Sequence, residues 1–251
     1  MKTLALAKFT LLSLWKKNLR FVLISLLAFY VLFYFYLKGI APDIPEKVLS
    51  DLTLSLESVS LFACCLLLVC LEIPEDIRLK KCYFLLSKGI SRTQYLLGKF
   101  GGIAMAAAIF LFAYSFAVAV FLSAFSGISP GPILSLLPFF LFKSLVWISI
   151  LILISLSGNT VISLTGGCLI YFLTNFHEYL RLASAQGSLV SKILNLAAYV
   201  LPNLEYYNLQ GPVVHRLAIP ALYWLYLLLY TIAYISFMIS LAGLLIDHRE
   251  L

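Results

Sequence analysis

Six long apolar runs constrain this chain more than any other feature of its sequence. A helix that crosses the hydrocarbon core of a bilayer needs about 20 mostly apolar residues. The runs have about this length, and their continuous apolar character differs from the alternating pattern of membrane-barrel strands. They cover residues 21–37, 52–71, 100–125, 138–156, 160–176 and 219–246. The sequence therefore predicts an all-α integral membrane protein with six transmembrane helices, built as one domain over residues 1–251.

The distribution of charge agrees with this class and predicts an orientation. Only 12% of the residues are charged, against about 25% in soluble domains. In a six-span layout, twelve of the 18 Lys and Arg residues fall in segments on the same side of the membrane as the N-terminus. Because cytoplasmic loops carry the excess of basic residues, we expect both termini in the cytoplasm and the chain in the cell (inner) membrane. The orientation of the chain in the membrane accounts for its net charge of +7. The charge therefore does not indicate nucleic-acid binding, and we expect no nucleic-acid partner.

Two segments outside the runs are expected to lie at the membrane surface. Residues 2–18 combine leucines with lysines, a composition typical of an interfacial helix that contacts membrane lipids. Residues 177–218 form the longest outer loop. The middle of this loop places apolar residues on one helical face, but the run is too short to cross the membrane. We predict a short re-entrant or interfacial helix there, before the last span.

Small residues recur at every fourth position at the start of the third run. Gly98, Gly102 and Ala106 follow this spacing, which lets two helices approach closely in lipid. We expect this face to pack against another helix of the same chain rather than to form a dimer.

The motifs of common catalytic sites are missing from the sequence. It contains no G-x-x-x-x-G-K-[ST], no H-E-x-x-H and no G-x-S-x-G. His177, His215 and His248 are far apart, and His248 falls on the opposite side of the predicted membrane. The cysteines are expected to be reduced and to act as small apolar residues. We therefore expect no catalytic, cofactor or metal site in this chain.

A dense charged segment, residues 72–99, joins the second and third runs on the predicted cytoplasmic side. Pro74 suits the start of a helix, and Glu75 suits its first turn. Gly89 suits a left-handed cap that ends this helix, and Ser91 suits the N-cap of the next one. The segment is thus predicted to be a short surface helix between two breaks. It is either a solvated loop helix or a docking helix for a soluble partner.

The same segment resembles the cytoplasmic coupling region of permeases of the type-2 ATP-binding-cassette exporter family. That region has an acidic start, a leucine pair, a turn with Ser and Arg, and a Tyr-Leu-Leu-Gly-Lys run into the third span. The matching residues are Glu72, Pro74, Glu75, Leu85, Leu86, Ser87, Ile90, Ser91, Arg92, Tyr95, Leu96, Leu97, Gly98 and Lys99. Gly89 departs from the pattern, because a proline is common there. The layout of surface helix, six spans and large outer loop is also similar.

This resemblance implies the transmembrane subunit of an ATP-driven exporter that is not itself an enzyme. Separate cytoplasmic ATP-binding-cassette ATPase subunits would bind ATP and Mg, and a second copy or a related permease would complete the membrane part. The residues expected to couple to the ATPase are Glu72, Glu75, Asp76, Arg78, Lys80, Lys81, Leu85, Leu86 and Arg92. The substrate is not indicated. The alternatives are a membrane-embedded enzyme that transfers a lipid or sugar, and a non-transporting membrane scaffold.

Two charges fall inside the apolar runs. Glu57 and Lys143 are each five residues from the outer end of a run, or roughly 8 Å deep at 1.5 Å per residue. Intramembrane charges usually pair or line a polar cavity. We predict that these two side chains pair, within or between subunits; the alternative is that each reaches separately to the outer interface.

Four tyrosines form a stripe along the last apolar run. Tyr223, Tyr226, Tyr230 and Tyr234 are three or four residues apart, so they share one helical face about 80° wide. Lipid offers no partner to a phenol hydroxyl, which indicates that the stripe faces protein or a hydrated path. Packing through hydroxyl hydrogen bonds and a substrate-lining face are the two interpretations.

Overall fold

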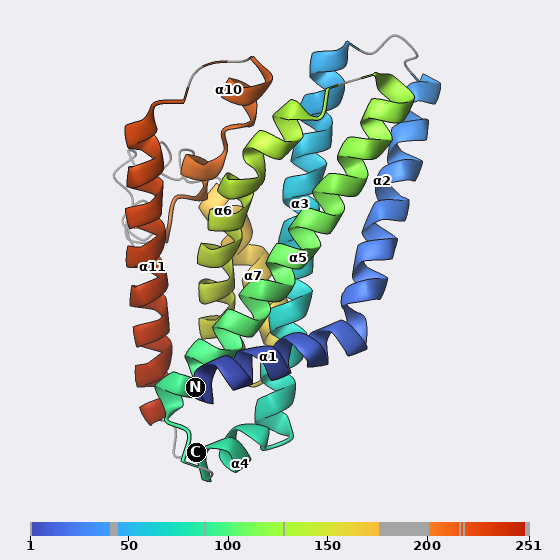
Figure 1. Cartoon of the computed structure of the whole chain (residues 1–251). Helices are drawn as coiled ribbons and strands as arrows, with labels where there is room; N and C mark the ends of the chain where they lie inside the picture. Colours follow the sequence, from blue (N-terminus) through green and yellow to red (C-terminus); the bar gives the residue numbers. More distant parts are fainter. Residues whose placement is uncertain are drawn as a thin grey trace, which may run out of the picture.

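The computed structural model describes residues 2–40, 45–87, 89–127, 129–175, 201–215, 217 and 219–248, and all regular elements in these ranges are helical. The long helices are α2 (Arg20–Ile40), α3 (Glu46–Arg78), α5 (Arg92–Ser126), α6 (Gly131–Ser155) and α11 (Ala221–His248). The shorter elements are α1 (Lys2–Leu14), the π-helical turn η1 (Trp15–Leu19), α4 (Lys81–Ser87), α7 (Thr160–Asn175), the 3-10 turn η2 (Leu204–Tyr207) and α10 (Gln210–Val214). Figure 1 shows their arrangement.

Five helices in the described part are long and apolar enough to cross a membrane: α2, α3, α5, α6 and α11. The helix α7 is also apolar but has 16 residues, or about 24 Å of length, which is short of a full span. The all-α class and the multi-pass membrane character are thereby confirmed. The six-span layout stays a prediction.

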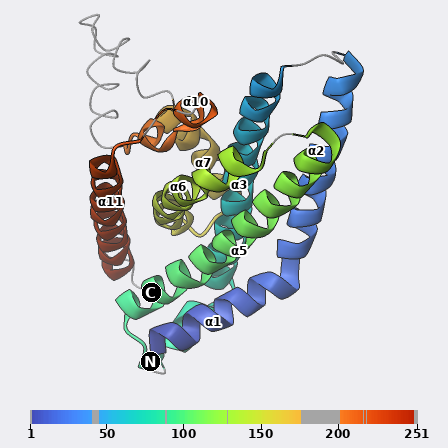
Figure 2. The same cartoon turned by 45° about the horizontal axis from the view of Figure 1, so that its top comes forward.

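The long helices form a bundle around α6, which contacts α3, α5, α7 and α11. The two ends of the bundle differ (Figures 1 and 2). One end carries α4, the start of α1 and the end of α11; we call it the α4 end. The other carries α10 and the start of α3; we call it the α10 end. At the α4 end, α1 lies across the bundle alongside α5 and turns sharply into α2 through η1.

The contact between α1 and α5 depends on two glycines. A Cβ atom added to Gly98 would lie 2.6 Å from Leu6 Cδ2, and one added to Gly102 would lie 2.6 Å from Thr10 Cβ. Ala106 is fully buried on the same face. The small-residue spacing therefore packs two helices of one chain, as expected from the sequence. Residues 2–18 are helical as predicted, and the apolar side chains of Leu4 and Phe9 remain exposed on the opposite face of α1.

Two helix boundaries differ from the sequence prediction because prolines lie inside helices rather than at their starts. The helix α3 begins at Glu46 and continues through Pro74, and α6 begins before Pro138. The prediction that a new helix starts at Pro74 is wrong. Pro74 and its neighbour Ile73 are buried, so packing around this turn of α3 outweighs the loss of one backbone donor. The short helix α4 starts only at Lys81.

As a result, α3 and α5 are longer than a bilayer core requires. They have 33 and 35 residues, or about 50 Å each, against about 30 Å of hydrocarbon. We call their paired extension towards α4 the α3–α5 arm. The helix predicted in the middle of the outer loop lies in residues 176–200, outside the described residues.

Candidate functional site

A cluster of buried charges joins the two helices of the arm. Lys99 of α5 places its Nζ atom 2.9 Å from Glu72 Oε1 and 2.5 Å from Asp76 Oδ2 of α3, and all three side chains are 3–4% exposed. The Tyr95 hydroxyl donates a hydrogen bond to Asp76 Oδ2 at 3.3 Å. Each helix contributes residues four positions apart, which lie on one face. Because charges leave water only when they are paired, this cluster fixes the register of α3 against α5.

The α4 helix is attached to this cluster at its first residue. Lys81 Nζ lies 3.5 Å from Asp76 Oδ1 and 3.7 Å from Glu75 Oε1. Lys80, just before α4, has a φ of 54°, a backbone conformation that lets the chain turn abruptly after α3. These contacts place the start of α4 beside the end of the arm, and the abrupt turn at Lys80 sets its direction.

The turn after α4 has both caps that the sequence predicts. Gly89 has a φ of 74°, and its carbonyl accepts a hydrogen bond from Lys2 Nζ at 3.0 Å. Ser91 caps α5 and forms a reciprocal capping box with Gln94. The connection between α3 and α5 is therefore fixed at both of its turns.

The outer face of this connection is exposed and has a mixed apolar and basic character. Leu79 is 52% exposed and Phe84 is 61% exposed. We call this face the tip surface; its exposed residues are Arg78, Leu79, Lys80, Lys81 and Phe84. Figure 1 shows α4 projecting beyond the long helices. The sequence analysis singled out neither Leu79 nor Phe84 as an exposed residue; the signal in the sequence was the position of these two apolar residues among charged ones.

The residues expected to couple to an ATPase do not form one surface. Glu72 and Asp76 are buried inside the arm, because Lys99 draws both carboxylates towards α5. Arg92 is half-buried and donates to the Ile246 carbonyl of α11 at 3.4 Å. The exposed members of the set are Arg78, Lys80 and Lys81. Glu75 and Leu85 are half-buried, and the side chain of Leu86 lies outside the described ones. A role of the nine residues in coupling to an ATPase stays a prediction, in which the two buried acids would act from inside the arm.

Cys82 of α4 packs inward beneath the tip surface. It is 4% exposed, and burial, with a smaller effect of the Asp76 charge, raises the pKa of its thiol. A neutral thiol is a poor nucleophile and metal ligand. Among the described residues, no group of three or more His, Cys, Asp and Glu side chains is arranged to hold a metal ion.

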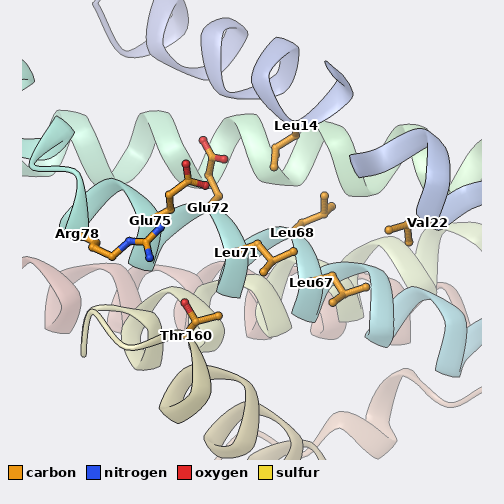
Figure 3. A pocket seen from close by; sticks show the side chains of 9 residues that line it. All are labelled: Leu14, Val22, Leu67, Leu68, Leu71, Glu72, Glu75, Arg78 and Thr160. Atoms are coloured by element: carbon orange, nitrogen blue, oxygen red, sulfur yellow. The ribbon is translucent and has the colours of Figure 1, made fainter. Parts of the chain in front are cut away.

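A cavity of about 200 Å³ lies beside the arm, between α3, the α1–α2 bend and the start of α7. Figure 3 shows an apolar wall that becomes polar towards Arg78; the lining residues are Leu14, Val22, Leu67, Leu68, Leu71, Glu72, Glu75, Arg78 and Thr160. The change occurs between Leu71 and Glu72, within one turn of α3.

Glu57 and Lys143 do not pair within the chain. Ser115 of α5 donates to Glu57 Oε1, whereas Lys143 Nζ donates to Ser58 Oγ at 3.4 Å and to Asn175 Oδ1 at 3.3 Å. Successive residues of a helix point about 100° apart, so Ser58, and not Glu57, faces α6 and α7. Glu57 and Lys143 lie about 16–18 Å along their helices, because α3 begins before Leu52 and α6 begins before Pro138. Pairing between subunits stays a prediction.

The tyrosine stripe of α11 packs against residues 201–209. The Tyr223 hydroxyl donates to the Tyr206 carbonyl at 2.6 Å, and the Tyr230 hydroxyl accepts from the Asn203 backbone N–H at 2.9 Å. Tyr226 is 46% exposed, and Tyr234 lies against Tyr230 with ring centroids 4.8 Å apart. The contacts of Tyr223 and Tyr230 favour the packing interpretation. A substrate-lining role for the stripe stays a prediction.

The segment that ends the outer loop is inserted into the α10 end of the bundle. Leu204 and Tyr207 of η2 are fully buried, and the Tyr207 hydroxyl lies 2.6 Å from Thr231 Oγ1 of α11. Gln210 of α10 bonds Ser55 and the Leu54 carbonyl of α3. The sequence analysis treated this stretch only as the end of the outer loop, because so short a stretch has no periodicity to indicate a buried face.

Comparisons of the sequence with models of known protein families and with curated proteins find no match. The class that the fold defines is an all-α protein with the long apolar helices of a multi-pass membrane protein.

Proposed function

We propose that this chain is the transmembrane subunit of an ATP-driven exporter, and that a cytoplasmic ATP-binding-cassette ATPase docks on its tip surface. The observation that carries the proposal is the exposure of Leu79 and Phe84 among basic residues at the end of the α3–α5 arm. Exposed large apolar side chains gathered in one patch are typical of an interaction site. The proposal places both termini and α4 in the cytoplasm.

The arm is suited to carry a displacement of α4 into the bundle. Lys81 ties α4 to Asp76, and Lys99 ties Asp76 to α5. Lys2 and Arg92 connect the same end to α1 and α11. Since close-packed and buried contacts transmit strain rather than absorb it, a partner that moves α4 would move α3 and α5 as one unit.

The ATPase partner would bind ATP and Mg, since the sequence has no phosphate-binding loop. A second copy of the chain, or a related permease, would provide the other half of the export route. The substrate class stays open. A membrane-embedded enzyme and a non-transporting scaffold are the competing functions, and neither requires an ATPase at the tip surface.

Affinity purification of the tagged chain from its native membranes tests the proposal. We expect an ATP-binding-cassette ATPase in the eluate, with ATP hydrolysis that vanadate inhibits. The double variant Leu79→Ser with Phe84→Ser should lose this partner. Burying a large apolar side chain contributes about 1.5–3 kcal/mol, so losing two weakens binding by more than about 100-fold.

Two further variants make the test specific. Arg78→Glu with Lys80→Glu should also weaken the complex, whereas Lys47→Glu, exposed near the start of α3 at the α10 end, should leave it unchanged. Lys81 is left unchanged in these variants because its side chain contacts Asp76. Recovery of no ATPase with the unmodified chain, or equal recovery with the Leu79 and Phe84 double variant, would refute docking at the tip surface.

A further inference from the structure

The cavity beside the α3–α5 arm is large enough to hold part of a small molecule. Its volume of about 200 Å³ equals that of about seven water molecules at ~30 Å³ each. Leu71 in its lining is 38% exposed, and Arg78 is exposed too, so the cavity opens to the surroundings of the bundle. A cavity of this size and openness can take a small headgroup and the adjoining part of one acyl chain, while the rest of a lipid stays outside.

The residues that α3 contributes to the lining share one face of this helix. At about 100° per residue they fall within a sector about 140° wide; they are Leu67, Leu68, Leu71, Glu72, Glu75 and Arg78. Residues 58–71 carry no charge, whereas residues 72–81 carry six charged side chains. Figure 3 shows the leucines at one end of the cavity and the two glutamates with Arg78 at the other. The lining therefore matches an amphipathic ligand in one direction only.

Glu75 and Arg78 present charges of opposite sign to this cavity. The charge of Glu72 is compensated inside the arm, because Lys99 Nζ lies 2.9 Å from it and both side chains are buried. Glu75 has a weaker contact, since Lys81 Nζ is 3.7 Å away and the Lys81 side chain is 46% exposed. Residues three positions apart on a helix have Cβ atoms about 5–6 Å apart. One carboxylate and one guanidinium thus lie side by side at the polar end.

We propose that this cavity binds a phospholipid with a primary-amine headgroup of the ethanolamine type. The guanidinium of Arg78 matches the geometry of a phosphate group, and the ammonium two carbons away would donate hydrogen bonds to the Glu75 carboxylate. The adjoining acyl chain would lie along Leu67 and Leu71. A choline headgroup has no N–H to donate, and a glycerol headgroup would bring an uncompensated negative charge next to two carboxylates. The proposal does not depend on the export function.

Mass spectrometry of the intact chain, released from detergent micelles, tests the site directly. The chain is titrated with dioleoyl phosphatidylethanolamine and, separately, with phosphatidylcholine and phosphatidylglycerol that carry the same acyl chains. We expect one tightly bound phosphatidylethanolamine per chain. Its apparent affinity should exceed that of the choline lipid by about tenfold or more, because the choline lipid lacks a charged hydrogen bond. Phosphatidylglycerol should bind no better than the choline lipid.

Single variants separate the contacts of the headgroup from those of the acyl chain. Glu75→Gln should reduce the affinity for phosphatidylethanolamine to about that for phosphatidylcholine, whereas Arg78→Gln should weaken the binding of both. Leu71→Trp, at a partly exposed position, should fill the apolar end and block the cavity. Lys80→Gln, which removes an exposed charge outside the lining, should bind all three lipids like the unmodified chain.

The unfolding midpoint in detergent gives a second measurement, since a ligand that binds only the folded state raises it. It should rise saturably with phosphatidylethanolamine in the unmodified chain and not in Arg78→Gln. Equal affinities for the amine and choline lipids, binding that does not saturate, or a full preference for the amine lipid in Glu75→Gln would overturn the proposal. Neither measurement involves an ATPase, so the outcome is independent of docking at the tip surface.

Discussion

Replacing Lys99 by Met tests whether the buried charge cluster holds the α3–α5 arm together. The substitution keeps a long side chain in the contact but removes the cation that lies 2.9 Å from Glu72 Oε1 and 2.5 Å from Asp76 Oδ2. The two carboxylates would then remain buried between the helices without this partner. Lys81 still approaches Asp76 at 3.5 Å, but its side chain is 46% exposed, so solvent screening leaves it a small effect.

The expected loss of stability follows from the burial of the three side chains, which are 3–4% exposed. Removing one partner of such a pair costs about 3–5 kcal/mol, because an uncompensated charge stays buried. For a chain of this size, each kcal/mol of lost unfolding free energy lowers the unfolding midpoint by about 2–4 °C. The Lys99→Met variant should therefore unfold roughly 6–20 °C below the unmodified chain.

Thermal unfolding in detergent measures this difference, and a triple variant distinguishes charge from packing. Lys99→Met with Glu72→Gln and Asp76→Asn removes every charge of the cluster, so it should recover most of the loss. Lys80→Met, an exposed lysine on the neighbouring turn, should behave like the unmodified chain. The reasoning fails if Lys99→Met unfolds within about 1 kcal/mol of the unmodified chain, or if the triple variant is no more stable than the single one.

Two other predictions concern packing between elements. Gly102→Ala should cost about 1–3 kcal/mol by overpacking, since its Cβ would lie 2.6 Å from an α1 side chain; Gly101→Ala, with 3.6 Å of space, should be neutral or slightly stabilising in the same unfolding assay. Tyr230→Phe should cost about 1–3 kcal/mol, because the buried Asn203 N–H loses its acceptor. The exposed Tyr36 should tolerate Phe without change. The packing contacts are contradicted if Gly102→Ala is no more destabilising than Gly101→Ala, or if Tyr230→Phe is no more destabilising than Tyr36→Phe.

Local signals in the sequence predicted the features whose causes are local. The apolar runs predict helices because a backbone in lipid must satisfy its own hydrogen bonds. The positive φ of Gly89 and the N-cap of Ser91 involve only nearby residues, and both were predicted; the reciprocal bond from Gln94 was not. The spacing of Gly98 and Gly102 indicated a close helix contact, although it could not indicate α1 as the partner.

The features that the sequence did not reveal depend on contacts between distant segments. Pro74 is a local signal for a helix start, yet Lys99 pairs with the residues on either side of it from another helix. Glu57 and Ser58 are neighbours in the sequence, yet their side chains face different helices. No sequence pattern specifies the rotation of α3 that decides this. The exposed tip surface and the buried position of Leu204 likewise follow from the arrangement of the whole bundle.

The hydrogen bonds at the α4 end also have a consequence for biosynthesis. The Arg92 guanidinium donates to the Ile246 carbonyl across 154 positions of the chain, and Lys2 donates to Gly89 across 87. Because α11 is synthesised after the other described helices, a nascent chain can insert the earlier spans before the acceptor for Arg92 exists. Contacts of such long range form late and slowly. The Arg92 contact at the α4 end therefore has to wait until α11 has left the ribosome, so this end is completed only after the earlier spans have been inserted.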